Sequence, residues 1–300
     1  MPQYKTIRRY ALLLEMIEKH RPNLELIKEF LERHDFNVSK RTIERDIQYI
    51  RTYYGIDIKY SNFGRPGYYI DKKNSPDLPN LLRFIEVANT AAIVVESLQD
   101  GRSAISYMDF ESDGSLRGYE LLECLLYAIK NHRLIKFSYE KYITGEKNEY
   151  TLQPLLLKEF QTRWYLVGIR DDIQKLRVFG IDRISEIETT KKTFKPKRGF
   201  NPLDMFRHTI GINSTENEPQ LIELSFTKLQ GNYVKALPWH YSQKILLDNE
   251  EELRIELFVN PNLEFKQRIM ATGAAVKVLK PQWLADEIRD RLKASLERYG

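Results

Sequence analysis

Cysteine is almost absent from this sequence, because Cys124 is the only one in 300 residues. A single cysteine cannot form a disulfide within the chain, which fits a reducing compartment. Long apolar runs are missing too, since no stretch approaches the roughly 18 consecutive apolar residues of a membrane span. The first ten residues are basic and polar and lack the apolar segment of a secretory signal. We therefore expect a cytoplasmic protein that does not enter a membrane.

The motifs of common nucleotide- and metal-dependent enzymes are also missing. We find no G-x-x-x-x-G-K-[ST] loop, no G-x-G-x-x-G turn, no H-E-x-x-H helix, no cysteine pair and no nucleophile elbow. The five histidines are scattered along the chain and are better explained as polar surface residues than as metal ligands. Cys124 lies among leucines in a helical pattern and is interpreted as a small buried residue. We expect no catalytic activity, no cofactor and no metal.

Basic residues are in modest excess, with 47 Lys and Arg against 42 Asp and Glu and a net charge of +5. The excess is concentrated in two blocks. Residues 1–75 hold 15 basic and 10 acidic side chains, residues 119–200 hold 16 and 11, and residues 76–118 between them hold 3 and 7. Two basic blocks favour a polyanionic partner, although ordinary solvated surface charge also gives an excess of this size.

The first seventy residues carry the pattern of three helices followed by a hairpin. Ser39 is a good N-cap for the third helix, and Gly55 is a good stop. This order of elements is that of a winged helix-turn-helix domain, which we expect over residues 1–72. The helices are expected at residues 4–20, 24–33 and 39–53, and the strands at 56–60 and 68–70.

The third helix has two different faces. Its apolar stripe of Ile43, Ile47, Ile50 and Tyr54 must face the core. On the opposite face, an Arg side chain can bind guanine, a Gln can bind adenine, and the first-turn amides can bind a phosphate. A structural three-helix bundle with a solvated basic face is the alternative, which the hairpin after the helix disfavours. The predicted DNA-binding residues are Lys40, Arg41, Thr42, Arg45, Gln48, Tyr49 and, at the tip of the hairpin, Arg65.

The rest of the chain predicts a linker and two further domains. Residues 73–118 form a helical linker, whose apolar helix over 81–98 suits either dimerisation or domain packing. Residues 119–200 contain a helix and five short strands, which predict a small β-barrel. Residues 201–300 continue in the order strand, helix, strand, strand, helix, strand, which is ferredoxin-like. The fold class is thus α+β and multidomain. The barrel strands are expected at 134–139, 150–158, 162–170, 175–181 and 183–189.

The central domain resembles the WYL-domain family, which is named after a tripeptide. Trp164-Tyr165-Leu166 is that tripeptide, residues 135–139 are similar to the family's first strand, and residues 177–184 are similar to its Arg-x-Phe-x-x-Asp-Arg-Ile segment. Three matched segments in the right order are far more specific than the tripeptide alone. Outside this domain, the resemblance extends to residues 38–47 of the winged helix and to residues 237–240 and 278–284 of the C-terminal extension.

The resemblance implies an SH3- or Sm-like barrel in a bacterial transcription regulator, often a homodimer, whose WYL domain senses a negatively charged ligand such as single-stranded DNA. Strand alternation independently predicts that Arg177, Phe179, Ile181 and Arg183 share a face, where arginines beside an aromatic ring can clamp phosphates and stack a base. Trp164 and Phe179 are equally compatible with the core. By the same alternation, the residues expected in the core are Tyr165, Val167 and Ile169. The predicted effector-binding residues are Tyr139, Arg163, Trp164, Arg177, Phe179 and Arg183.

Two functions of different classes fit these patterns. The first is a homodimeric, ligand-responsive transcription factor that binds a double-stranded DNA operator. The second is a single-stranded nucleic-acid-binding accessory protein in phage defence or DNA-damage signalling. An enzyme acting on nucleotides has no support, because no set of residues for proton transfer or metal binding occurs.

Overall fold

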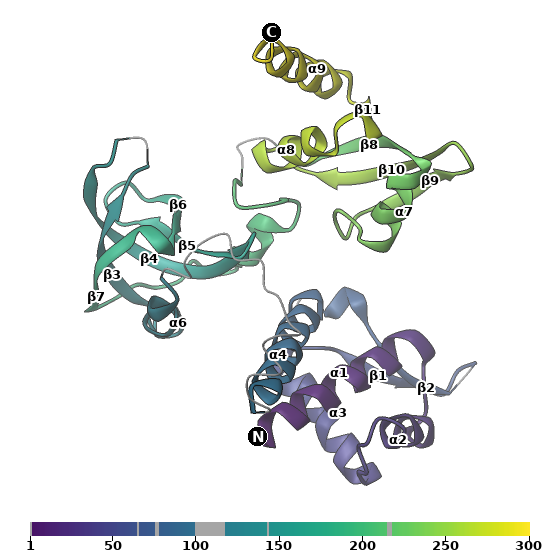
Figure 1. Ribbon diagram of the computed structural model, residues 1–300. Coiled ribbons are helices and arrows are strands. Elements are labelled where there is room, and N and C mark those ends of the chain that lie inside the picture. Colours follow the sequence, from purple (N-terminus) through teal and green to yellow (C-terminus); the bar gives the residue numbers. More distant parts are fainter. Residues whose placement is uncertain (1, 65, 76–77, 100–117, 143, 215–217) are drawn as a thin grey trace. The chain divides into compact units, whose positions relative to one another are not determined.

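The computed structural model describes residues 2–300 except 65, 76–77, 100–117, 143 and 215–217 (Figure 1). The chain divides into two compact units, Met1–Ser112 and Asp113–Gly300. Among the helices described, none is both long and apolar enough to cross a membrane.

The first unit contains the three helices and the hairpin in the predicted order (Figure 1). The helices are α1 (Pro2–His20), α2 (Leu24–Glu32) and α3 (Lys40–Tyr54), and the strands are β1 (Ile58–Ser61) and β2 (Gly67–Ile70). A 3-10 turn (Lys72–Asn74) precedes α4 (Leu78–Gln99), which packs on α1. The helical pattern of the linker and the alternation of the hairpin are thus confirmed. Of the predicted linker over 73–118, residues 76–77 and 100–117 lie outside the described residues.

The ends of the helices follow from local chemistry. The Leu26 amide donates to Asn23 Oδ1 at 2.9 Å, and the Thr42 amide donates to Ser39 Oγ at 3.2 Å. Gly55 ends α3 with a φ of 64°, a left-handed conformation that strains residues with a Cβ atom. The predicted cap and stop of α3 are both confirmed.

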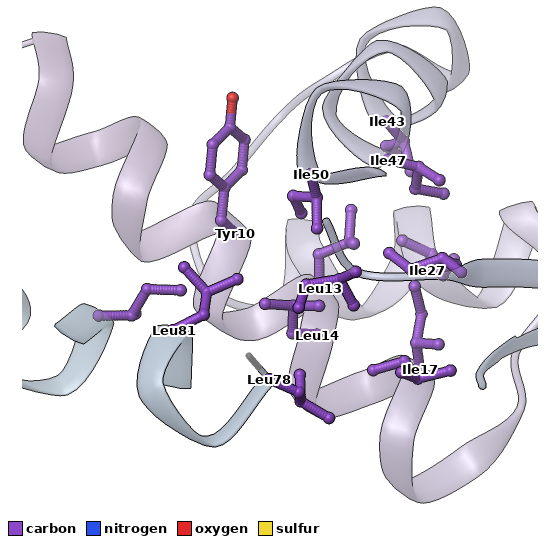
Figure 2. Close-up of a cluster of buried hydrophobic side chains, with 14 of the residues drawn as sticks. Tyr10, Leu13, Leu14, Ile17, Ile27, Ile43, Ile47, Ile50, Leu78 and Leu81 are labelled. Atoms are coloured by element: carbon purple, nitrogen blue, oxygen red, sulfur yellow. The ribbon is translucent and has the colours of Figure 1, made fainter. Parts of the chain in front are cut away.

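The core of this unit is formed by one face of each helix, as Figure 2 shows. From α3 it takes Ile43, Ile47 and Ile50, which are at most 2% exposed. Tyr54 is half-buried and packs against the same cluster. The apolar stripe of α3 therefore points inward, as predicted, and the opposite face points to solvent. The other labelled members in Figure 2 are Tyr10, Leu13, Leu14, Ile17, Ile27, Leu78 and Leu81.

The two-stranded wing is fastened to the end of α3. β1 and β2 pair antiparallel. Arg51 Nε donates to the carbonyl of Ile58, the first residue of β1, at 2.6 Å. Lys59 Nζ lies 2.9 Å from Asp57 and 2.7 Å from Asp71. These contacts make α3 and the base of the wing one packed body.

In the second unit, the first elements among the described residues are a 3-10 turn (Tyr119–Leu121), helix α6 (Leu122–Lys130) and a five-stranded antiparallel sheet. The sheet order is β6-β5-β4-β3-β7. Within the described residues, β6 and β7 do not pair with each other, so the predicted barrel is not closed. The 3-10 turn Ile181–Arg183 connects β6 to β7. The strands are β3 (Arg133–Glu140), β4 (Lys147–Phe160), β5 (Arg163–Arg170), β6 (Lys175–Gly180) and β7 (Ile184–Thr193).

The core of this sheet corrects the interpretation of β5. Leu166, together with half-buried Trp164, packs into the main apolar cluster. Of the residues expected in the core, only Val167 is buried, whereas Tyr165 and Ile169 are half-exposed and belong to the other face. Three consecutive residues of β5 are buried in its middle, so both faces are covered there and alternation could not identify the core side.

The last part of the chain has the predicted order of strands and helices. Its antiparallel sheet has the order β11-β8-β10-β9. Ile222, Leu224 and Phe226 of β8 alternate into a core that also takes Val234 from α7 and Phe265 from α8. A 3-10 turn (Pro202–Phe206) lies in the connector before it. The elements are β8 (Gln220–Thr227), α7 (Lys228–Ala236), β9 (Lys244–Asp248), β10 (Glu252–Val259), α8 (Leu263–Thr272), β11 (Val276–Lys280) and α9 (Gln282–Glu297).

Candidate nucleic-acid interface and effector site

The exposed edge of α3 carries the predicted cationic residues. Arg41, Arg45 and Gln48 are all exposed, at spacings that place them along one side of the helix. Neither arginine has an acidic or hydrogen-bonding partner in the described part of the chain, which leaves both guanidinium groups available to an external anion. Gln48 Nε2 donates to Thr52 Oγ1 at 3.2 Å, so its amide is already oriented along the helix.

The N-terminus of α3 opens into a shallow hollow lined by both arginines and the capping residues. Ser39 Oγ accepts from the Thr42 amide and lies 3.1 Å from Thr42 Oγ1. The preceding amides of the first turn have no acceptor within the helix, so they suit a phosphate. Glu44 also lines the hollow, and its carboxylate limits where a phosphate can sit.

The other predicted residues of α3 have partners within the unit. Lys40 forms an ion pair with Glu25 of α2, and both side chains are about half exposed. Tyr49 is 42% exposed and stacks beside Tyr53, with ring centroids 4.4 Å apart. Lys40 and Tyr49 both remain accessible, but each already has a partner side chain within the unit, whereas Arg41 and Arg45 have none in the described part of the chain. Arg65, predicted at the tip of the wing, lies outside the described residues.

The predicted effector residues do not form one strand face. β6 ends at Gly180, and Ile181–Arg183 is a 3-10 turn, so the alternation that holds for Arg177 and Phe179 does not reach Arg183. Phe179 is 5% exposed and lies in the core, where it contacts other aromatic rings. The expectation of a shared face is therefore wrong, and the Phe179 ring faces the interior rather than solvent.

Arg183 is instead the centre of a compact cluster with tyrosines. Its guanidinium carbon lies 4.1 Å from the centroid of the Tyr142 ring and 4.8 Å from that of Tyr139. Tyr142 donates from its hydroxyl to Asp182 Oδ2 at 3.1 Å. Arg183 Nε is buried and has no hydrogen-bond acceptor among the described residues. A buried donor of a charged group without an acceptor is unusual and suits an anionic ligand.

The backbone of the turn keeps this cluster compact. A Cβ atom on Gly180 would lie 2.5 Å from Asp182 Oδ1 and 3.1 Å from Arg183 Nη2, so a side chain there would displace the Asp182 carboxylate and crowd the Arg183 guanidinium. The Gly180 amide donates to the Tyr139 hydroxyl at 3.3 Å. Burial raises the pKa of Tyr139 above its ordinary value, while the charge of Arg183 opposes this. The Tyr139 hydroxyl therefore stays protonated and retains a hydrogen to donate.

Two further predicted residues stand at the start of β5. Arg163 is exposed at the start of β5, and Trp164 is half-buried against the core. Sequence reasoning missed Tyr142, which follows β3 in a loop, where no periodic pattern marks it. In the described ranges no group of His, Cys, Asp and Glu side chains could hold a metal ion.

Comparison with known proteins agrees with the resemblance noted in the sequence. The WYL domain family matches residues 120–189, and the WCX domain family matches residues 218–296. No match was found among curated proteins.

Among solved structures, the chain is similar to proteasome accessory factor B/C (PafBC) of Arthrobacter aurescens, with 19% identity and a TM-score of 0.32 over 98% of this chain and 47% of that one. It therefore spans about half the length of the PafBC chain. It is also similar to a CRISPR Cas-related protein, with 13% identity and a TM-score of 0.38 over 99% of this chain and 85% of the other. The two domain matches show what the chain contains: a WYL domain over residues 120–189, followed by a WCX domain over residues 218–296.

Proposed function

We propose that the protein is a transcription regulator that binds a double-stranded DNA operator through α3. The observation that carries the proposal is the outward edge of α3, where Arg41 and Arg45 are exposed and have no partner in the described part of the chain. A long helix with a packed apolar face and a free cationic edge can enter the major groove, where Arg binds guanine bidentately and Gln48 can bind adenine. The capped N-terminus of α3 and the adjacent hollow would hold a backbone phosphate.

The test is selection of duplexes by the full chain from a pool of random DNA, followed by gel-shift titration at about 0.15 M salt. We expect one enriched sequence. Arg45→Ala should cost about 1–3 kcal/mol and relax the preference at one base pair. Arg298→Ala, an exposed arginine beyond the end of α9, is the matched control and should change nothing. Binding without any sequence preference would refute the proposal, and equal weakening on every sequence would make Arg45 a phosphate contact.

We further propose that the WYL domain senses an anionic effector derived from nucleic acid. The support is the Arg183 cluster, where a guanidinium lies on two tyrosine rings and keeps one buried donor without an acceptor. Tyr142 is 67% exposed and presents a ring on which a base can stack. Arg163 and Arg177 are exposed on the same sheet and add positive charge for phosphates. Binding there would change how a homodimer presents its two copies of α3.

The Arg183 cluster also supports the second candidate, an accessory protein whose main activity is binding single strands. A platform of aromatic rings and a guanidinium binds single strands of any nucleotide sequence, because every base has a flat face that can stack on it. Tight single-strand binding by the full chain without a footprint on any duplex would favour this candidate. In both proposals the protein is cytoplasmic, non-enzymatic and free of cofactors.

A further inference from the structure

Phe63 stands at the tip of the wing, between β1 and β2, and is 91% exposed. No other large apolar side chain in the described residues is as exposed. Turns of this kind are usually built from small and polar residues, which solvent accommodates well. A phenylalanine here gains nothing from folding, so packing within the unit does not account for its position.

The wing does not need the Phe63 ring for its own structure. The Phe63 amide donates to Ser61 Oγ at 3.2 Å, and Gly64 takes a φ of 71°, so the turn is shaped by the two neighbours. The other wing aromatics are engaged, since the Tyr60 and Tyr68 rings meet edge to face at 4.9 Å. The Phe63 ring contacts no ring or cation in the described part of the chain.

The charges at the base of the wing are neutralised internally. Lys59, the cation of β1, lies between the carboxylates of Asp57 and Asp71, which leaves it little charge for a phosphate. Arg51 Nε is held by the carbonyl of Ile58, and this contact makes the wing move with α3. The apolar tip is therefore held in a fixed position relative to the cationic edge of α3, to which the β1–β2 hairpin connects it.

We propose that Phe63 inserts between two base pairs in the minor groove next to the major-groove site of α3, where it partly unstacks them and kinks the duplex. The inference rests on the proposed function, because it needs α3 on DNA. Apolar side chains, Phe among them, are the wedges that proteins use for this purpose. Flexible pyrimidine–purine steps open most easily, so such a step should recur at one fixed distance from the bases that α3 contacts.

The experiment uses the full chain and the duplex that it selects, with 2-aminopurine placed in turn at each step beside the α3 site. Wild-type protein should raise the fluorescence at one step only. Phe63→Ala should abolish this rise and weaken binding about tenfold, whereas Phe63→Leu should keep most of both. The salt dependence of binding should be the same for all three proteins, because no charge changes.

Phe84→Ala is the matched control, since Phe84 is a 61% exposed phenylalanine on α4, and it should behave as wild type. Unchanged thermal unfolding of Phe63→Ala would show that the variant is folded. A wild-type complex with no fluorescent step, or a rise that persists in Phe63→Ala, would overturn the wedge while leaving operator binding intact. Failure of the wild-type chain to select any duplex would overturn both.

Discussion

Arg9 on α1 holds Asp46 on α3 through two hydrogen bonds, from Nε to Oδ2 at 2.5 Å and from Nη2 to Oδ1 at 3.1 Å. Their side chains are 13% and 4% exposed, so the pair lies largely inside the first unit. Asp46 follows Arg45 directly, yet its carboxylate points inward while Arg45 points to solvent. The pair therefore fixes the rotation of α3 against α1, and with it the direction of the cationic edge.

Removing one member of this pair should destabilise the first unit strongly. Arg9→Ala should cost about 3–5 kcal/mol, because Asp46 would keep a buried charge without a partner. Asp46→Ala should cost somewhat less, since Arg9 is the more exposed partner. Urea unfolding of the full chain, followed by circular dichroism, measures both losses. The double variant should lose less than the sum of the two single variants, and strictly additive losses would show that the side chains do not act as a pair.

Asp46 also shows where prediction from the sequence stops. The cap, the stop and the isoleucine stripe of α3 were predictable because each depends on residues within a few positions of one another. The burial of Asp46 depends on Arg9, which lies 37 positions away and carries no local signal. An aspartate is also a residue that usually lies on the surface, so its identity alone predicts exposure. Contacts of this range come from the tertiary packing of α1 on α3.

The N-cap of α3 offers a second measurable effect. Ser39→Ala removes the oxygen that accepts from the Thr42 amide, and should lower the free energy of unfolding of the first unit by about 1 kcal/mol. Ser39→Asn should retain most of that stability, because Asn caps as well as Ser. Denaturant titration of the two variants beside wild type checks this. Equal stability of Ser39→Ala and wild type would mean that solvent satisfies the amide without cost.

The WYL domain shows a different limit of prediction. All five strands lie close to their expected positions, because alternation and turn residues are local signals. The effector residues were placed on one face by extending the alternation of β6 through Ile181, and the 3-10 turn breaks it. Tyr142 escaped prediction altogether, since a loop residue has no periodicity. The sequence thus predicted Arg183 as a member of the candidate site, but it did not predict how the residues around Arg183 are arranged.

Arg183 should dominate the binding of single strands. In fluorescence anisotropy with a labelled oligothymidylate, Arg183→Ala should weaken binding by the full chain by about 1–3 kcal/mol, the value of one lost stacking contact. Arg183→Lys should not restore it, because an ammonium group cannot lie flat on two rings. Tyr142→Phe keeps the ring but loses the bond to Asp182, so its effect should be smaller.

Two controls make the result specific to the site. Arg298→Ala removes the same charge elsewhere and should leave affinity unchanged. Duplex binding by Arg183→Ala should match that of wild type in the absence of effector, which shows that the first unit is intact. If Arg183→Ala bound single strands as tightly as wild type, the Arg183 cluster would not be the effector-binding site.

His240 should make the stability of the last part of the chain depend on pH. Its Nε2 lies 2.8 Å from the Arg207 carbonyl, and its Nδ1 lies 2.7 Å from Ser242 Oγ. Burial lowers the pKa of this imidazole below its ordinary value of 6.5, more than the Arg207 carbonyl raises it, and nearby His208 lowers it further. The unfolded chain therefore binds this proton more readily than the folded chain does. Stability conferred by neutral His240 is complete above the unfolded pKa and is lost as the pH falls below it toward the folded pKa.

The unfolding temperature of this part should accordingly be lower at about pH 5.5 than at about pH 7.5. His240→Asn keeps a polar side chain that does not titrate, so its unfolding temperature should differ less between the two pH values. His20→Asn removes an exposed histidine of the first unit and should leave the wild-type difference in place. Scanning calorimetry of the full chain resolves the comparison, because the readout is the change with pH and not the absolute stability. If wild type and His240→Asn lost the same number of degrees on acidification, the proton uptake would belong to another group, and burial of His240 would have no part in it.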